Sequence, residues 1–388
     1  MAKATVDEHA ALIRSLVVLP TSSEAVSLAE ALGRVTATAV LSPVDLPLFR
    51  NSQMDGYAVR TADLPGTLPV IAEVAARPGE PAALLPGTAV TIMTGAPMPE
   101  GADAVVPVEH VSRDGDTVTI PQPRTPGEFV RERGSDLRRG DELLPEGRLL
   151  ASRHLAVLAA AGITTVKVRS RVRVGIITTG AELVAEVTRV GEIYDSNAVA
   201  LAAAITAAGA IVSVSARVGD DADAMSAALD TAVATSDVVV TSGGISMGDH
   251  EVVRDVLEPL GASVTTIAMQ PGGPQATAVL HGVPVIGFPG NPVSTQLSFE
   301  VFLAPILREH AGLPAALREE RTLVGDVKSV SGKRQFLRGR AVGENRVEIV
   351  GGASSHLVAG FAAADLLVDI PADMTSLAKG TTVETWAL

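Results

Sequence analysis

Between residues 171 and 313 the sequence alternates between short apolar runs and helical segments, and no other feature constrains the fold as strongly. RVRVGIITTG and DVVVTSGG predict buried strands, and NAVALAAAITAAG predicts a helix. Near-continuous apolar strands that alternate with helices are typical of a doubly wound, mostly parallel sheet in an α/β domain. In such a sheet, ligands bind beyond the carboxyl ends of the strands.

The rest of the sequence predicts further domains around this α/β domain at residues 171–313. Residues 1–45 and 145–170 predict a mixed helical and linker domain. Residues 46–144 consist of short apolar runs punctuated by Pro and Gly, which is typical of a β-rich inserted domain. Residues 314–388 contain strand-like runs about ten residues apart, which predict a small C-terminal β-barrel or sandwich. Of these two, we expect a β-barrel for residues 314–388.

Two helices are expected near the N-terminus. TVDEHAALIRSLVV has helical spacing, and so does TSSEAVSLAEALGR, in which Ser22 or Ser23 would be the N-cap and Gly33 the stop. Further along, ASRHLAVLAAAGITTVKV predicts a helix that ends at Gly162 and is followed by a strand.

Composition and charge exclude several kinds of function. The net charge of −13 disfavours nucleic acid as a partner, because phosphate binding depends on an excess of Lys and Arg. The chain has no cysteine, which excludes disulfides, thiolate nucleophiles and zinc–thiolate sites. MAKATVDEHAALIRSL lacks the apolar core of a signal peptide, and the most apolar stretch is broken by Ala-Ala-Gly. We therefore expect a cytoplasmic protein without a membrane or nucleic acid partner.

Three glycine loops follow predicted strands of the α/β domain. They are TTGAEL, TSGGISMGDHE and FPGNPVS. Gly243 and Gly244 would let the backbone approach a ligand, and Asn291-Pro292 would open a helix whose free N–H groups face an anion. The alternative is that these glycines only turn tight corners between strand and helix. The loops contain neither a dinucleotide fingerprint nor a P-loop.

Carboxylates accompany these loops, and they would repel an anionic ligand unless a cation bridges the two. The residues are Glu182, Asp195, Asp220, Asp249 and Glu251. Mg²⁺ takes one or two carboxylates together with ligand phosphates. The alternative is that each is a first-turn acid favoured by the helix dipole.

The β-rich domain holds two further candidates. Arginines gather around Asp136 in FVRERGSDLRRGDELLPEGR, either as a site for a phosphate or other oxyanion or as a solvated, charge-mixed hairpin. In RNSQMDGYAVR, the pair Asp55-Gly56 could form a hairpin turn, because Asp-Gly tolerates the positive φ that such turns need. Alternatively, a rigid loop holds the Asp55 carboxylate for chemistry.

Eight motifs occur in the order seen in the molybdopterin molybdenumtransferase (MoeA) family, which includes the C-terminal part of gephyrin. They are NSQMDGYAVR, IMTGAPMPEGADAVV, VRERGSDLRRGDELLPEGRLL, TTGAEL, GEIYDSN, TSGGISMGD, PGGP and GFPGNPVS. The resemblance covers essentially the whole chain. It implies four domains and an elongated homodimer, whose active cleft lies between the α/β domain of one subunit and the β-rich domains of the other.

The implied reaction is the insertion of molybdate into adenylylated molybdopterin with Mg²⁺, which releases AMP and molybdenum cofactor. Motif matching implies catalytic roles for Asp55, Thr94, Asp136 and Glu182, of which Asp55 and Glu182 would also hold the metal. The implied substrate-binding residues are Ser242, Gly243, Gly244, Asp220, Glu251, Pro289, Gly290, Asn291, Arg131, Arg338 and Ser355. The resemblance also suggests a molybdopterin adenylyltransferase as a candidate protein partner.

The sequence departs from the family pattern around PGGP. Thr266, Gln270 and Gly273 stand where the family commonly has lysines, and Glu251 stands where many members carry Asp. Two alternative functions therefore remain beside the transferase. One is a molybdopterin adenylyltransferase, which the flanking β-rich domains argue against. The other is a catalytically weakened molybdopterin-binding or scaffold paralogue.

Overall fold

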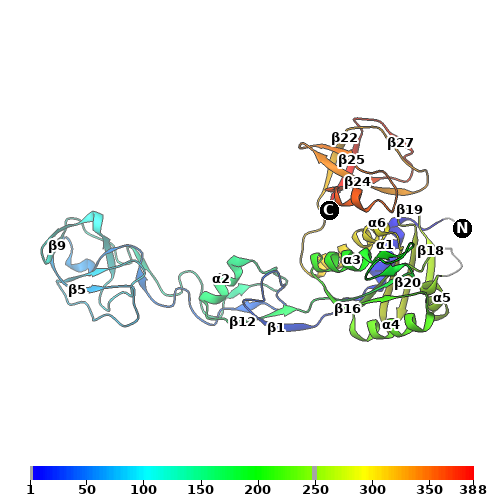
Figure 1. Cartoon of the computed structure of the whole chain (residues 1–388). Helices are drawn as coiled ribbons and strands as arrows, with labels where there is room; N and C mark the ends of the chain where they lie inside the picture. The colour runs from blue at the N-terminus through cyan, green and yellow to red at the C-terminus, as the bar shows by residue number, and fades with distance from the viewer. Residues whose placement is uncertain (1–2, 247–250) are drawn as a thin grey trace. The chain divides into compact units, whose positions relative to one another are not determined.

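The structure is a computed structural model that describes residues 3–246 and 251–388 (Figure 1). The chain forms two compact units. The larger unit comprises Met1–Ser23 and Arg169–Leu388, and the smaller one comprises Glu24–Val168. Within the described residues, no helix has the length and apolar character needed to cross a membrane.

The larger unit contains the predicted α/β sheet, in the strand order β16-β13-β17-β21-β20-β18. The first four strands are mutually parallel, whereas β20 runs antiparallel to both β21 and β18. The strands are β13 (Arg173–Thr179), β16 (Ile211–Val218), β17 (Val238–Ser242), β18 (Ser263–Thr266), β20 (Pro274–Leu280) and β21 (Val283–Phe288). The mostly parallel sheet is confirmed, although the sequence prediction missed β20.

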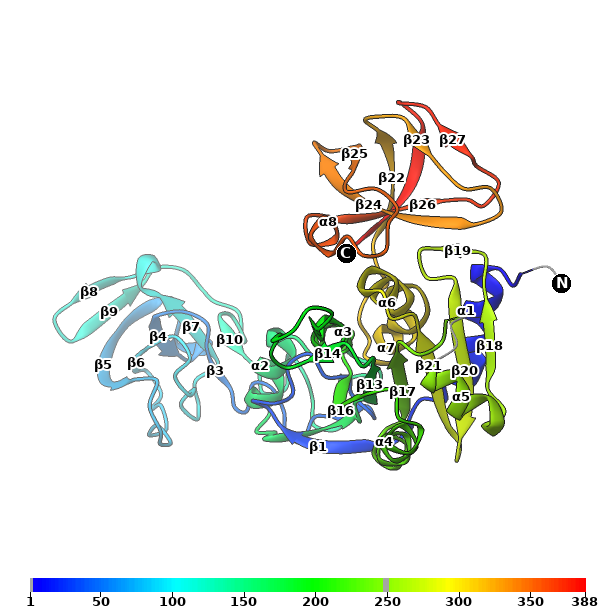
Figure 2. The same ribbon diagram turned by 45° about the vertical axis from the view of Figure 1, so that its right-hand side comes forward.

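Helices cover both faces of this sheet (Figure 2). One face packs against α1 (Val6–Leu16), α3 (Ser196–Ala207), α6 (Pro292–Ser298) and α7 (Ala304–His310). The other face packs against α4 (Ala222–Thr235) and α5 (Val252–Leu257). Successive side chains of a strand point to opposite faces, so Ile176 joins the first core and Ile177 the second. Apolar residues are therefore needed on both faces, as the continuous apolar runs indicated.

The two predicted N-terminal helices have different outcomes. The first is confirmed as α1, which begins with a capping box between Thr5 and Glu8. The second prediction is wrong, because the chain there forms a strand, β1 (Ser23–Ser27), that pairs with β12 (Thr165–Arg169). Pairing with a distant strand overrides the local helical spacing. The later helix is confirmed as α2 (Ser152–Ala160), and Gly162 follows it with a φ of 75°.

Within the smaller unit, residues 46–144 form a β-rich region, as predicted. Its main sheet has the order β7-β4-β6-β5-β9-β8, and its two faces pack into separate apolar clusters. The strands are β4 (Gly56–Val59), β5 (Gly66–Val74), β6 (Ala89–Ile92), β7 (Ala104–Pro107), β8 (Ser112–Asp114) and β9 (Thr117–Ile120). Just before β4, the strand β3 (Asn51–Ser52) pairs antiparallel with β10 (Val130–Arg131), which follows β9 in the chain.

The C-terminal region of the larger unit is a closed five-stranded barrel, so the barrel expectation is confirmed. Closure follows because β24 pairs with both β25 and β26. The strands are β22 (Arg318–Leu323), β24 (Arg334–Val342), β25 (Arg346–Ile349), β26 (Leu366–Ile370) and β28 (Thr382–Ala387). The short strand β19 (Met269–Gln270), from the α/β region, pairs in parallel with β24.

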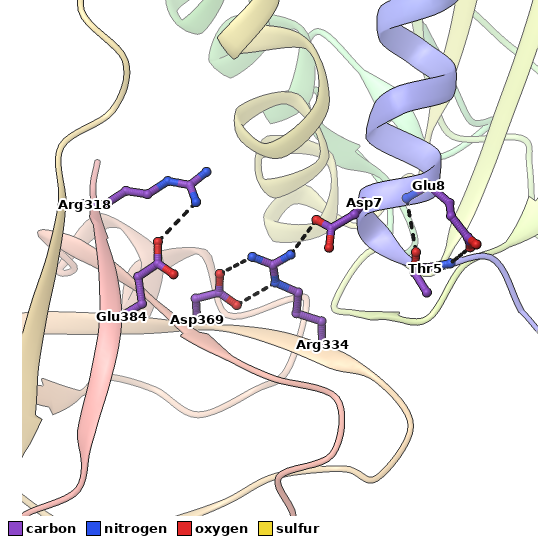
Figure 3. Close-up of polar contacts among 7 residues, drawn as sticks. All are labelled: Thr5, Asp7, Glu8, Arg318, Arg334, Asp369 and Glu384. Atoms are coloured by element: carbon purple, nitrogen blue, oxygen red, sulfur yellow. Dashed lines mark hydrogen bonds and ion pairs between the residues drawn. The ribbon is translucent and has the colours of Figure 1, made fainter.

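An ion-pair cluster also links the barrel to helix α1 (Figure 3). The Arg334 guanidinium donates a hydrogen bond of 2.8 Å to Asp369 on β26 and another of 2.8 Å to Asp7 on α1. Asp369 is buried, so this pair is shielded from solvent on one side. The start of β24 is thus held at a defined place against the α/β region.

Candidate active site

A cavity of about 780 Å³ opens in the larger unit where loops follow the carboxyl ends of the parallel strands. Its walls come from the loops after β13, β16, β17 and β21, from residues 266–274 and from residues 353–355 of the barrel. Parallel strands bring all their carboxyl ends to one edge of a sheet, which explains why loops so distant in sequence meet here. A cavity of this size accommodates a cofactor-sized molecule.

The loop after β17 depends on two glycines. Gly243 has a φ of 97°, and a Cβ there would lie 2.5 Å from the Thr179 carbonyl oxygen. Gly244 has a φ of 64°, and a Cβ there would lie 2.9 Å from Val253. A side chain at either position would therefore clash and adopt a strained backbone conformation. Both glycines line the cavity, but the atoms that a Cβ would meet belong to Thr179 and Val253, so the tight corner after β17 is what requires glycine at these positions.

A buried polar network holds the loop after β21 against the loop after β17. The Asn197 amide donates hydrogen bonds to Ser242 Oγ at 2.9 Å and to the Gly290 carbonyl oxygen at 2.7 Å. The Thr295 hydroxyl donates to the Pro289 carbonyl oxygen. Asn197 Oδ1 is buried and has no hydrogen-bond partner among the described residues. Ser242 is a support behind the cavity wall, whereas Pro289 and Gly290 form the wall itself.

The acidic residues of the cavity differ in how they are bonded. Asp195 caps α3 by accepting a hydrogen bond from the Ala198 N–H, and its other carboxylate oxygen accepts one from the Thr178 hydroxyl. The Glu251 carboxylate accepts a hydrogen bond of 2.8 Å from the Ser246 N–H. These four carboxylates all line the cavity: Glu182, Asp195, Asp220 and Glu251. Glu182 and Asp220 are exposed, and their carboxylates accept no hydrogen bond in the described part of the chain. Asp249 lies outside the described residues.

Metal binding by protein groups alone is not supported by this arrangement. Among the described residues, no group of three His, Asp or Glu side chains lies close enough to hold a metal ion. A cation that keeps ligand oxygens in its coordination shell needs fewer protein carboxylates. Glu182 and Asp220 fit that requirement because both are exposed at the cavity and accept no hydrogen bond from the residues that the structure describes.

The barrel contributes one wall through the loop that contains Ser355. The Val293 N–H, in the first turn of α6, donates to the Ser355 carbonyl oxygen at 3.2 Å. Arg338 does not line the cavity. It is fully buried, and its Nη2 donates to the carbonyl oxygens of Gly352 and Ser354, so it holds this loop from behind. Its contact with a substrate would thus be indirect.

In the smaller unit, Asp55 and Thr94 lie together. Both the N–H and the hydroxyl of Thr94 donate to Asp55 Oδ1, at 2.6 and 2.8 Å. The Thr94 backbone N–H, followed by its hydroxyl, holds the pKa of Asp55 below its ordinary value. Asp55 Oδ2 accepts no hydrogen bond within the described residues, so it is available to a ligand or water.

The Asp55-Gly56 pair does not form a positive-φ hairpin turn. Gly56 begins β4 and is not among the glycines with positive φ. A Cβ at Gly56 would lie 2.2 Å from the Val106 carbonyl oxygen on the neighbouring strand β7. Glycine is required here for close strand packing, and the Asp55 side chain projects from the bend just before that packed position.

The arginine cluster of the smaller unit gathers around Asp45 rather than Asp136. Arg133 Nε donates to Asp45 Oδ2 at 2.7 Å, and the Arg139 N–H donates to Asp45 Oδ1 at 2.8 Å. The Arg139 backbone N–H is the main reason why the pKa of Asp45 is lowered, and Arg133 adds to it. Asp136 is exposed, and Arg131 makes only a long contact of 3.5 Å with Asn51 Oδ1.

The predicted site residues thus fall into three groups. Those that line the cavity are Glu182, Asp220, Gly243, Gly244, Glu251, Pro289, Gly290, Asn291 and Ser355. Ser242 and Arg338 stand behind its walls. Asp55, Thr94, Asp136 and Arg131 belong to the smaller unit.

Sequence reasoning missed three residues of the cavity. Asn197 could have been suspected, because it opens the predicted helix NAVALAAAITAAG two residues after Asp195. Tyr194 is 64% exposed at the cavity and carried no separate signal beyond its motif. Lys333 also lines the cavity, and no local pattern indicated it, since it lies on the barrel side of the larger unit.

Comparison with known proteins gives a consistent result along the whole chain. Residues 4–162 match the MoeA N-terminal region (domain I and II), residues 175–309 match a probable molybdopterin binding domain, and residues 321–388 match the MoeA C-terminal region (domain IV).

Individual relatives cover nearly the same length. Molybdopterin molybdenumtransferase 2 of Mycobacterium tuberculosis is 39% identical over 384 residues, which cover 94% of each chain. Molybdopterin molybdenumtransferase of Haemophilus influenzae is 32% identical and covers 98% of this chain and 97% of its own. The crystal structure of a molybdopterin biosynthesis moea protein from Pyrococcus horikosii superposes with a TM-score of 0.84, at 33% identity and 99% coverage of both chains.

Proposed function

The chain belongs to the MoeA family and is a transferase that inserts molybdenum into molybdopterin; we propose that it acts on adenylylated molybdopterin, with molybdate and Mg²⁺, and releases AMP. In this reaction the bond between AMP and the molybdopterin phosphate is hydrolysed. Two dithiolene sulfurs replace two oxygens of molybdate, which leave as water or hydroxide. Molybdenum stays hexavalent, so no oxidant is needed. The sulfurs come from the substrate, which is why a chain without cysteine can perform the insertion.

The observation that carries this proposal is the combination of groups in the 780 Å³ cavity. The loops of Gly243-Gly244 and Pro289–Asn291 line this cavity, and the second of them leads into α6, whose dipole places partial positive charge at this wall. Glu182 and Asp220 stand at the same edge, and their carboxylates accept no hydrogen bond from the described residues. An anionic nucleotide beside acidic side chains requires a bridging cation, and Mg²⁺ meets that need.

Glu182 is the cavity residue proposed to hold Mg²⁺, and Asp55 is proposed to complete the metal site. Mg²⁺ would neutralise phosphate charge and polarise the phosphorus–oxygen bond that breaks. The lowered pKa of Asp55 keeps its carboxylate ionised at neutral pH, so it is a weak base. Its unbonded Oδ2 is suited to orienting water or a cation rather than to removing a proton.

We propose that the protein is a cytoplasmic homodimer in which Asp55 and Thr94 of one protomer serve the cavity of the other. Two exposed side chains support a contact at this surface, Met54 at 37% and Met93 at 42% exposed, directly beside Asp55 and Thr94. Exposed methionines adapt to a partner surface. A separate molybdopterin adenylyltransferase remains a candidate partner that delivers the substrate.

The decisive experiment measures AMP release from adenylylated molybdopterin while molybdate and Mg²⁺ are varied independently. We expect release only when both are present, and a loss of at least about a hundredfold in Glu182→Gln. Release without molybdate would contradict coupled insertion. ATP consumption with pyrophosphate release would instead identify an adenylyltransferase, and tight binding without AMP release would identify a binding or scaffold paralogue.

The dimer proposal has its own test by mixing inactive variants. Co-expression of Asp55→Ala with Glu182→Gln should restore about a quarter of the wild-type activity, because mixed dimers of a symmetric pair regain one intact site. The control is Asp55→Ala with Asp55→Asn, in which both changes remove the same carboxylate and no site is restored. Equal activities of the two mixtures would refute sharing between protomers.

A further inference from the structure

The cavity has a marked imbalance of charge. Four carboxylates line it, and Lys333 is the only positively charged side chain among the described residues of its wall. Thr266, Gln270 and Gly273, where lysines were expected, also line the cavity and add no charge. A molybdate ion carries two negative charges, so the acidic residues would repel it unless a cation offsets them.

The order of strands separates Lys333 from the acids. Asp220 follows β16, Glu182 follows β13 and Glu251 lies beyond β17, on the β16-β13-β17 side of the sheet. The loop around Gln270 leads into β20, on the far side of β21. Its strand β19 pairs with β24, which begins immediately after Lys333. Lys333 therefore enters the cavity from the end opposite the carboxylates.

The backbone on both sides of Lys333 is firmly held. The neighbouring Arg334 donates its N–H to the Ala268 carbonyl oxygen at 2.9 Å, and its guanidinium is fixed by Asp369 and Asp7 (Figure 3). The Gln335 amide donates to Gln270 Oε1 at 2.6 Å. Lys333 itself is half-buried. In the described part of the chain, its ammonium group forms no hydrogen bond or ion pair.

We infer that Lys333 binds the oxyanion substrate, molybdate, at the barrel end of the cavity, next to the loop of Ser354 and Ser355. This inference rests on the proposed function for the identity of the anion. Three observations carry it: the residue lines the cavity, its ammonium group has no partner among the described residues, and firmly held neighbours position its backbone. A lysine that served only as a solvent-exposed surface charge would not require any of these three features. The metal and the substrate phosphates would then bind at the end of the cavity that carries the carboxylates. Molybdate and the phosphates would thus occupy opposite ends of the cavity.

The test compares three variants of the full chain: Lys333→Gln, Lys333→Arg and Lys328→Gln. Lys328 is exposed in the same C-terminal region and lies outside the cavity wall, and its replacement by Gln makes the same change in net charge. Two quantities are measured, the affinity for molybdate alone by isothermal titration calorimetry and the KM for molybdate in AMP release. We expect Lys333→Gln to weaken both by about tenfold to a hundredfold, since a hydrogen bond to a charged group is lost.

The other readouts separate binding from folding. Lys333→Arg should retain molybdate affinity within about threefold because the charge is kept. Lys328→Gln should match the wild type. The melting temperature of Lys333→Gln should be unchanged, because no ion pair is removed. Wild-type molybdate affinity in Lys333→Gln would overturn the inference while leaving the transferase reaction intact. Absence of AMP release in the wild type would overturn the proposed function, and the titration would still decide whether Lys333 binds the oxyanion.

Discussion

Replacement of Gly56 by alanine tests whether close strand packing holds Asp55 in place. The new Cβ would lie 2.2 Å from the Val106 carbonyl oxygen, 2.9 Å from its carbon and 3.0 Å from Pro107 Cα. The first distance falls about 0.8 Å short of the 3.0 Å that real Cβ contacts require. All three atoms are backbone atoms of β7, which pairs with β4 over its whole length. No side-chain rotation can relieve the overlap, so the strands must separate.

The magnitude follows from the kind of atom that is displaced. Overpacking typically costs about 1–3 kcal/mol, and a backbone clash inside a paired sheet belongs at the upper end. The lower entropy of the unfolded alanine chain recovers about 0.4–1 kcal/mol. The smaller unit should therefore lose about 2 kcal/mol, which corresponds to roughly 4–8 °C in its melting temperature.

The assay is hydrogen–deuterium exchange with mass spectrometry, combined with AMP release. Peptides that contain β4 and β7 should lose protection in Gly56→Ala, peptides that contain β17 should keep it, and activity should fall because Asp55 precedes the displaced residue. Gly325→Ala is the control, since a Cβ there meets nothing within 4 Å and the residue has no positive φ. Wild-type protection in β4 together with wild-type activity would refute the reasoning.

Three further predictions concern other residues. His9 is buried, and burial lowers its pKa from 6.5 to about 4. Between pH 6.5 and about 4 the unfolded chain therefore binds a proton at His9 that the folded protein does not. The free energy of unfolding should thus fall by about 3 kcal/mol as the pH drops from 7 to 4. Urea unfolding of His9→Leu should show a shallower dependence on pH than the wild type. Asn197→Leu removes both hydrogen bonds that join the loops of the cavity, and it should lower stability by about 2–3 kcal/mol and raise the substrate KM; unchanged values would show that the loops do not depend on it. Thr94→Val removes one of two donors to Asp55, so the acid limb of the pH–rate profile should move to higher pH, and a coincident profile would argue against Asp55 as the group that titrates.

Local patterns were sufficient for the parallel strands of the α/β domain. Continuous apolar runs identified β13, β17 and β21 because strands covered on both faces need apolar residues at every position. Once these strands are parallel, the loops that carry Glu182 and Gly243 must meet at one edge. This part of the site therefore follows from the sequence by a geometric rule. The missed strand β20 is an edge-proximal antiparallel strand with a less continuous apolar run.

Contacts between distant segments decided the rest. The residues after Ser23 have helical spacing, but they form strand β1 because they pair with β12, more than a hundred residues away in the chain. Arg131 and Asp136 were grouped by their proximity in sequence, whereas Asp45, from an earlier segment, takes the hydrogen bonds of that loop.

By itself, the sequence determined the family, the alternation of parallel strands and helices in the α/β domain, and the edge of that sheet where its loops meet. The tertiary structure alone decided why residue 56 is glycine, why Arg338 supports a loop instead of facing the cavity, and that Lys333 reaches the cavity at all. Periodicity and capping are local properties that are encoded within a few residues. A clash with β7, the burial of a guanidinium and the charge of a cavity wall each depend on which remote segment packs there.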